Sequence, residues 1–222
     1  MEYYGTLGPT CCEPLILKKM FDAGMTGIRL NLSHSSLETS HAWIHHYFDA
    51  ARHADGDKKL MIDLIGPELR IGNLEGEMGL CKGAHVILGY AGIPVLKEIF
   101  QYIKRDQTIL LDDGKIKLVT ERKISELSWR CRILCGGVLT SHKSIALPGC
   151  VINNPTLTEA DLRNLSVAKQ YKVTDVMLPF VRNKADLIIL REALREYDCE
   201  DIRIFAKIEN MTGVEHLEEL LP

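Results

Sequence analysis

Basic charge in excess and long apolar runs are both missing from this 222-residue sequence. Its formal net charge of -3 provides no basic field of the kind that attracts a nucleic-acid backbone. No stretch of roughly 18 apolar residues occurs, and the N-terminus lacks the charged-then-apolar layout of a signal peptide. We therefore expect no nucleic-acid partner, no membrane partner and a cytoplasmic location.

Paired metal-binding cysteines and glycine-rich nucleotide motifs are also missing. The seven cysteines are an odd number and none has C-x-x-C spacing, so we expect reduced thiols rather than a structural zinc site. No G-x-G-x-x-G follows the first predicted strand, and no G-x-x-x-x-G-K-[ST] occurs anywhere. These absences exclude the two common fingerprints of open-sheet nucleotide-binding folds.

What the sequence does contain is an alternation of apolar strands and amphipathic helices. The predicted strands of this alternation lie at 2–6, 27–32, 59–64, 173–178 and 202–208. The predicted helices lie at 13–23, 37–52, 159–171, 183–197 and 213–221. Between Arg70 and Leu147 the pattern changes to short strands separated by glycines, which predicts an antiparallel β insert. Its strands are expected at 84–88, 108–111, 115–120, 129–135 and 144–147.

Alternating strands and helices imply an α/β fold with a parallel sheet, either open and doubly wound or closed as a (β/α)₈ TIM barrel. Spacing alone does not choose between the two. The missing nucleotide fingerprints favour the barrel. A closed barrel needs eight β/α units, and the sequence supplies about five before it ends.

Charged and polar side chains gather where the predicted strands end, which is where parallel α/β folds place their chemistry. Strand alternation sets Arg29, Asn31 and Ser33 on one side of the second strand. Asp63 ends the third strand, and Lys207 and Glu209 share one side at the end of the fifth. The structural alternatives are a half-exposed polar strand face and simple ion pairs. Taken together, the residues predict a site for a phosphorylated, carboxylated anion and a divalent metal, with Arg182 as a weaker candidate cation.

Seven short motifs follow one another along the sequence. They are Thr6-Leu7-Gly8-Pro9, Ala23-Gly24-Met25 with Arg29-Leu30-Asn31-Leu32-Ser33-His34, Asp63 with Gly66-Pro67-Glu68-Leu69-Arg70, Leu111-Asp112-Asp113-Gly114, Leu147-Pro148-Gly149, Leu157-Thr158-Glu159-Ala160-Asp161, and Lys207-Ile208-Glu209-Asn210 with Gly213-Val214. In this order they resemble the motifs of the pyruvate kinase family over nearly the whole chain. One such motif arises easily by chance, but seven in order do not.

The resemblance implies a (β/α)₈ TIM barrel, incomplete in this chain, with a small mobile all-β barrel lid inserted after strand 3. The implied domains are 1–70 for the first part of the barrel, 71–148 for the lid and 149–222 for the continuation, truncated before closure. It also implies a reaction, the transfer of a phosphoryl group from phosphoenolpyruvate to ADP, which gives pyruvate and ATP.

The same resemblance assigns roles to individual residues. Arg29 and Lys207 would bind the transferring phosphoryl group and act in catalysis, and Glu209 would be one of two carboxylate ligands of Mg²⁺ or Mn²⁺. The implied ligands of K⁺ are Asn31, Ser33, Asp63 and the backbone carbonyl of Leu64. The residues implied to face ADP or ATP are Asn31, His34, Arg70 and Lys143.

The chain also departs from the family pattern. Leu64-Ile65 stands where Thr-Lys is usual, Ser144 follows the lid lysine in place of Gly, and the chain ends before the motif that carries the second metal carboxylate. We therefore expect it to act as part of a longer polypeptide, homo-oligomeric in its full-length form, and to be inactive alone. The alternatives are a short non-catalytic paralogue that acts as a binding protein, and a metal-dependent lyase that uses phosphoenolpyruvate or pyruvate.

Overall fold

The computed structural model describes residues 1–33, 35–52, 58–150, 152 and 154–221. The chain divides into two compact units. Unit 1 comprises Met1–Pro67 and Pro155–Pro222, and unit 2 comprises Glu68–Asn154. Each unit has a hydrophobic core of its own. Within its described residues the chain has no helix long and apolar enough to cross a membrane.

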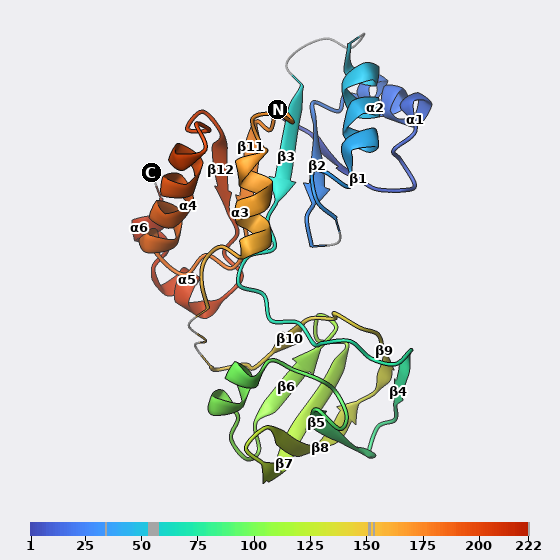
Figure 1. Ribbon diagram of the computed structural model, residues 1–222, viewed down its shortest axis with the longest axis vertical. Helices are drawn as coiled ribbons and strands as arrows, with labels where there is room; N and C mark the ends of the chain where they lie inside the picture. Colours follow the sequence, from blue (N-terminus) through green and yellow to red (C-terminus); the bar gives the residue numbers. More distant parts are fainter. Residues whose placement is uncertain (34, 53–57, 151, 153, 222) are drawn as a thin grey trace. The chain divides into compact units, whose positions relative to one another are not determined.

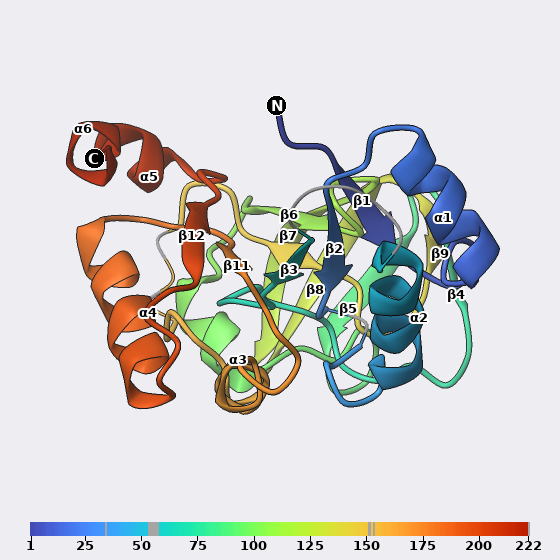
Figure 2. The same cartoon turned by 90° about the horizontal axis from the view of Figure 1, so that it is seen from above.

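Unit 1 is built on a parallel sheet of five strands in the order β1-β2-β3-β11-β12 (Figures 1 and 2). The strands are β1 (Tyr4–Leu7), β2 (Gly27–Asn31), β3 (Lys59–Asp63), β11 (Asp175–Leu178) and β12 (Arg203–Ala206). The helices of this unit are α1 (Pro14–Asp22), α2 (His41–Ala51), α3 (Glu159–Ser166), α4 (Lys184–Glu196), α5 (Met211–Glu215) and α6 (Leu217–Leu220). The predicted α/β alternation with a parallel sheet is thereby confirmed.

The two faces of this sheet have opposite character because side chains alternate along a strand. One face packs against the helices and carries Ile28, Leu30, Ile62, Val176 and Leu178, each almost fully buried in the core. The other face carries polar side chains at both ends of the strands. On β3 it reads Lys59-Met61-Asp63, and across the sheet on β12 and just beyond it reads Arg203-Phe205-Lys207. The sheet therefore has one apolar face, which packs against the helices, and one face whose charged side chains can form a functional site.

Local capping explains where two of the helices begin. The Thr158 side chain accepts a hydrogen bond from the Asp161 backbone N–H, while the Asp161 carboxylate accepts one from the Thr158 N–H, which completes a capping box at α3. Asn183 caps α4 by accepting from the Ala185 N–H. A cap of this kind stabilises a helix by about 1 kcal/mol.

Unit 2 is antiparallel. A five-stranded sheet runs in the order β10-β6-β7-β8-β5, beside a two-stranded β4-β9 ribbon. The strands are β4 (Met78–Leu80), β5 (His85–Gly89), β6 (Thr108–Leu111), β7 (Ile116–Ser125), β8 (Ser128–Cys135), β9 (Gly137–Leu139) and β10 (Ile145–Ala146), and a 3₁₀ helix spans Lys97–Tyr102. Its core includes Cys131, where burial raises the thiol pKa to about 12 and keeps the group protonated.

Several predicted boundaries were wrong. The helix expected over 37–52 begins only at His41, because Ser36–Ser40 form a turn in which the Ser36 and Thr39 hydroxyls bond each other's backbone N–H. The helix expected over 213–221 is two short helices that meet at His216. The strand expected over 202–208 is shorter, at Arg203–Ala206. Strands β4 and β9 were not predicted.

Candidate functional site

Four charged side chains meet at the carboxyl end of the sheet in unit 1. Arg29 of β2 donates from Nε to Asp63 Oδ2 at 3.0 Å, and its Nη2 also contacts that oxygen. Lys207, just after β12, lies with Nζ 3.4 Å from Asp63 Oδ1 and 3.5 Å from Glu209 Oε1. The carboxylate of Asp63 is therefore shared by two cations. Sequence reasoning proposed all four residues, and the fold brings them together.

Burial makes this cluster electrostatically strong. The Asp63 side chain is only 3% exposed, while those of Arg29 and Lys207 are each 28% exposed. Opposite charges interact more strongly in such surroundings than in water because the effective dielectric constant is lower. Lys207 Nζ donates a hydrogen bond to Asp63 Oδ2 at 3.5 Å, whereas its closer contact with the buried Oδ1 is an ion pair without hydrogen-bond geometry. The two cations are held side by side with their outer faces accessible.

The loops that follow β11 and β12 are joined to each other and hold Lys207 and Glu209 in place. Val181 donates its N–H to the Lys207 carbonyl at 3.1 Å, and Phe180 donates its N–H to Glu209 Oε2 at 3.2 Å. Asn210 donates to the Phe180 and Val181 carbonyls through its amide. Phe180 has a φ of 55°, a left-handed conformation that non-glycine residues rarely adopt. Glu209 is thus oriented by backbone as well as by Lys207.

Asp161 is a site-supporting residue that sequence reasoning treated only as part of a helix start. It is fully buried and accepts hydrogen bonds from the Ile65 N–H at 2.8 Å and the Gly66 N–H at 3.1 Å. Gly66 has a φ of +62°, and a Cβ there would lie 2.5 Å from Pro179 Cγ. The loop after β3 is therefore clamped by a carboxylate and packed too closely for any residue but glycine.

The candidate K⁺ ligands lie on neighbouring strands. Asn31 and Asp63 are register partners in β2 and β3, and Asn31 Oδ1 accepts the Ser33 N–H at 3.0 Å. The Leu64 side chain is a hydrocarbon and is buried in the core, so its backbone carbonyl is the only atom that could act as a ligand. These groups are oxygen donors, as alkali and alkaline-earth cations prefer. His34, a predicted nucleotide contact, lies outside the described residues.

Oxygen donors suitable for a divalent metal are present at the same strand ends. Glu209 Oε1 accepts no hydrogen bond from the described part of the chain, and its only charged neighbour there is Lys207. No group of three or more His, Cys, Asp or Glu side chains is assembled for a metal among the described residues. The chemistry of Glu209 therefore fits a hard cation such as Mg²⁺, with part of the ligand sphere left to water or substrate.

The other two predicted nucleotide contacts belong to unit 2. Arg70 pairs with Glu68 and donates to the His142 carbonyl at 2.8 Å. Lys143 pairs with Asp112 Oδ1 at 2.8 Å, and this contact, more than the one with Lys115, lowers the pKa of Asp112. Arg70 and Lys143 come from adjacent segments, since Ile71 donates its N–H to the Lys143 carbonyl. Asp112 belongs to the motif Leu111-Asp112-Asp113-Gly114, and its ion pairs with Lys143 and Lys115 are found only in the structure.

Arg182, the weaker candidate cation, is bound within unit 1 instead. Its guanidinium donates to both carboxylate oxygens of Asp186, at 3.0 and 2.7 Å, and to Thr156 at 3.3 Å. Asp186 and Thr156 are buried. A bidentate contact of this kind occupies most of the N–H donors of an arginine. The arrangement is typical of a structural anchor at the start of α4.

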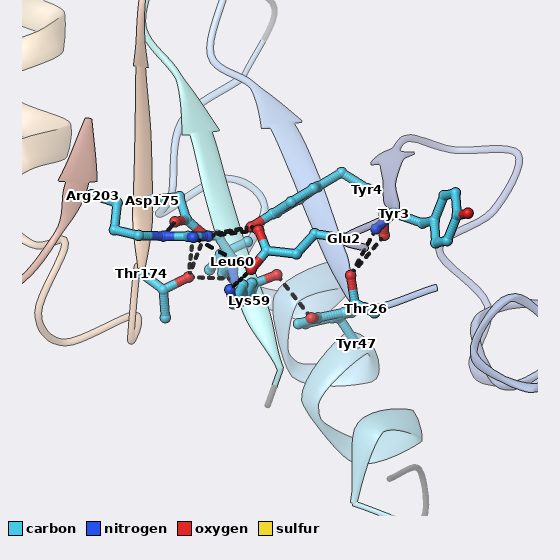
Figure 3. Close-up of polar contacts among 10 residues, drawn as sticks. All are labelled: Glu2, Tyr3, Tyr4, Thr26, Tyr47, Lys59, Leu60, Thr174, Asp175 and Arg203. Carbon is cyan, nitrogen blue, oxygen red and sulfur yellow. Dashed lines mark hydrogen bonds and ion pairs between the residues drawn. The ribbon is translucent and has the colours of Figure 1, made fainter. Parts of the chain in front are cut away.

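A second charged network lies at the opposite, amino-terminal end of the same sheet (Figure 3). Arg203 donates to Asp175 Oδ1 at 2.6 Å and to Glu2 Oε2 at 3.0 Å. Tyr4 donates its hydroxyl to Asp175 Oδ2 at 2.9 Å, and Lys59 pairs with Glu2. Arg203 is on β12 and Glu2 precedes β1, so side chains from the two edge strands meet although three strands separate them. The sheet must curve strongly for this to happen.

This network makes the free energy of unfolding depend on pH. Hydrogen bonds from Arg203, and secondly from Lys59, lower the pKa of Glu2 to about 2 from 4.5. Because the folded pKa is the lower one, the stabilisation is complete above about pH 4.5 and is lost as the pH falls towards 2. We expect Glu2→Gln to be less stable than the parent chain at pH 7 and equal to it near pH 2, as measured by urea denaturation across that range. The exposed Glu192→Gln should show no such gap, and a gap independent of pH would contradict the prediction.

Fold and site together define a class of protein. Parallel α/β sheets with charged residues beyond the carboxyl ends of their strands are enzyme scaffolds, and here the charged groups suit an anionic substrate and a cation. This class covers many different reactions, so the fold alone does not choose among them.

Comparison with known proteins narrows the class. The family model "Pyruvate kinase, barrel domain" matches residues 2–222. The chain is 33% identical to the pyruvate kinase of Staphylococcus epidermidis and 30% identical to those of Bacillus licheniformis and Chlamydia pneumoniae, in each case over 97% of its length. It covers 38%, 39% and 46% of those proteins respectively, less than half of each. The chain belongs to the pyruvate kinase family.

Proposed function

We propose that this chain supplies the phosphoryl-binding face of a pyruvate kinase, which transfers the phosphoryl group of phosphoenolpyruvate to ADP and gives pyruvate and ATP. The observation that carries the proposal is the convergence of Arg29 and Lys207 on Asp63 at the strand ends of a chain that matches this family along its length. A (β/α)₈ barrel closed by further units is part of the same proposal, and the curvature needed for Arg203 to reach Glu2 supports it.

The two cations have a direct role in this reaction. Phosphoryl transfer needs little covalent help, and catalysis comes from positioning and from stabilising charge on the moving group. Arg29 would orient the phosphoryl oxygens with its planar fork, and Lys207 would stabilise the negative charge that develops during transfer. Asp63 keeps both cations in place before the substrate arrives, so that little reorganisation is needed during the reaction.

Glu209 would hold Mg²⁺ or Mn²⁺, while Asn31, Ser33, Asp63 and the Leu64 carbonyl would hold K⁺. When bound, the divalent ion neutralises charge on the phosphoryl oxygens. Glu209 Oε2 is already fixed by the Phe180 N–H, which leaves Oε1 for the cation. All seven cysteines lie among the described residues and are free thiols, which supports a reducing compartment such as the cytoplasm.

A coupled assay tests this function. The polypeptide as the cell produces it is supplied with phosphoenolpyruvate, ADP, Mg²⁺ and K⁺, and pyruvate is followed through lactate dehydrogenase. We expect pyruvate formation that requires ADP. Binding of phosphoenolpyruvate without any turnover would instead indicate a non-catalytic binding protein, and conversion of a 2-oxo acid without nucleotide would indicate a lyase.

Lys143 offers a separable prediction about the nucleotide. It belongs to unit 2, where Asp112 holds it by an ion pair, and in our proposal it contacts ADP rather than the transferring group. We expect Lys143→Ala to raise the KM for ADP about tenfold while changing kcat and the KM for phosphoenolpyruvate little, as steady-state kinetics would show. Lys115→Ala is the matched control, since Lys115 also pairs with Asp112. An equal effect of both variants would assign the loss to Asp112 and not to a nucleotide contact.

A further inference from the structure

Unit 2 has a hollow of about 420 Å³ on its surface, and arginine dominates its lining. The charged residues around it are Arg105, Asp106, Glu121, Arg122, Arg130 and Arg132. Four come from the paired strands β7 and β8, and Arg105 and Asp106 come from the segment that precedes β6. None of them belongs to the site proposed for phosphoryl transfer. A hollow of this volume lies within the range of pockets that bind small molecules.

A β-bulge explains how so much charge gathers on one face. The register of β7 and β8 shifts between Thr120 and Arg122, so Glu121 is an extra residue. Thr120 is fully buried opposite Cys131, yet both Glu121 and Arg122 border the hollow. Without the bulge, alternation would send Glu121 and Arg122 to opposite faces. The bulge therefore adds a guanidinium to this surface.

The bulge also sets two like charges directly opposite each other. Arg122 and Arg130 are register partners across β7 and β8. A like-charge pair at such a position destabilises a sheet, by an amount on the order of 0.2–1 kcal/mol. Packing within the sheet therefore does not explain why two arginines face each other here. An anion bound between the two guanidinium groups would offset their repulsion.

The acidic residues of the hollow neutralise only some of its arginines. Arg132 donates to Glu121 at 2.9 Å, and Arg105 lies 4.0 Å from Asp106. Arg122 makes no hydrogen bond or ion pair with any residue that the structure describes. Arg130 Nε is buried without a hydrogen bond and lies 4.0 Å from Glu121 Oε2. Four arginines against two carboxylates leave a net charge of +2.

The ionisation of Glu121 is consistent with this count. Burial acts to raise the pKa of Glu121, but the hydrogen bond from Arg132 and the nearby His85 outweigh it, and the pKa lies below its ordinary value. Glu121 is therefore ionised at neutral pH, and the surplus of positive charge remains on Arg122 and Arg130.

We propose that this hollow binds a small phosphorylated anion, with Arg122 and Arg130 as its main contacts. Guanidinium groups match phosphate oxygens through paired N–H donors, and a surplus of two positive charges suits a doubly charged phosphate group. The binding would be independent of phosphoryl transfer, since it uses neither Arg29 nor Lys207.

Calorimetric titration of the purified chain with pyrophosphate tests the proposal, at about physiological ionic strength because salt screens exposed charges. The test variant is Arg122→Gln/Arg130→Gln. The charge-matched control is Lys82→Gln/Lys97→Gln, which alters exposed residues of the same unit away from the hollow. In a Lys207→Met background, which removes the phosphoryl contact proposed in unit 1, we expect one saturable site, weakened at least about tenfold in the test variant and unchanged in the control. Thermal unfolding without pyrophosphate should show the test variant at least as stable as the parent chain, since a like-charge pair is removed.

Two results would overturn the inference. One is the absence of saturable pyrophosphate binding by the parent chain. The other is binding that is not weakened in the arginine variant, and its loss in Lys207→Met would place the anion at the strand ends of unit 1.

Discussion

Replacement of Lys207 by methionine should abolish phosphoryl transfer, with kcat reduced at least about a thousandfold, a loss comparable to that of removing a cationic group that stabilises the transferring phosphate. Methionine keeps the length and apolar stem of lysine but removes the charge. The fold should be spared, because Asp63 retains its hydrogen bond with Arg29 at 3.0 Å and Lys207 is partly exposed. The coupled assay described above measures the loss, and circular dichroism checks the fold.

Lys19→Met is a suitable control, since Lys19 is an exposed residue of helix α1 and does not belong to the strand-end cluster. Turnover unchanged in Lys207→Met would remove Lys207 from the mechanism. Turnover lost together with the folded circular dichroism signal would mean that Lys207 is needed for structure, and the catalytic assignment would then pass to Arg29 alone.

The largest effect on stability is expected at Asp175. This side chain is fully buried at the start of β11, and it accepts hydrogen bonds from Arg203, Tyr4 and Thr174. Truncation in Asp175→Ala removes the acceptor that these three donors share, and it removes the shortest contact of Arg203. Loss of one partner from a buried charged network costs about 3–5 kcal/mol. Urea denaturation should show the midpoint falling with an unchanged m-value.

Two comparison variants sharpen this test. Asp175→Asn keeps the shape and one acceptor oxygen and should cost less than the alanine variant. The exposed Asp201→Ala, which lies two residues before Arg203, should change stability within about 0.5 kcal/mol. If Asp175→Ala were as stable as Asp201→Ala, the network in Figure 3 would not contribute to folding.

The sequence predicted the strand-end cluster well because its signal is local. Alternation along a strand sets Lys207 and Glu209 on one side without reference to the rest of the chain, and Arg29 and Asp63 end neighbouring strands in the same way. Sequence reasoning did not find Asp161, because its role depends on the loop after β3, 95 residues away. The capping motif Thr158-x-x-Asp161 predicts where helix α3 begins. It does not indicate that the Asp161 carboxylate also binds the loop after β3.

Other misses have equally physical causes. The three-residue strands β4 and β9 are too short and glycine-containing to show alternation. Asp112 and Asp113 adopt left-handed backbone conformations, with φ of 49° and 55°, which residue type alone only weakly indicates. The arginine hollow arises from a bulge in β7, and register shifts leave little trace in one sequence.

One apolar residue separates the two charged residues on the polar face of β3, and another does so on β12. This separation affects which substitutions the protein can tolerate during evolution. Met61 separates Lys59 from Asp63, and Phe205 separates Arg203 from Lys207. Four residues of strand span about 13 Å, so the network around Arg203 and Glu2 shares no direct contact with the strand-end cluster of Arg29, Asp63, Lys207 and Glu209. Substitutions in that network can therefore accumulate without removing a contact at the strand ends. The thermal stability of the protein can therefore change during evolution while the residues of the strand-end cluster remain under separate selection.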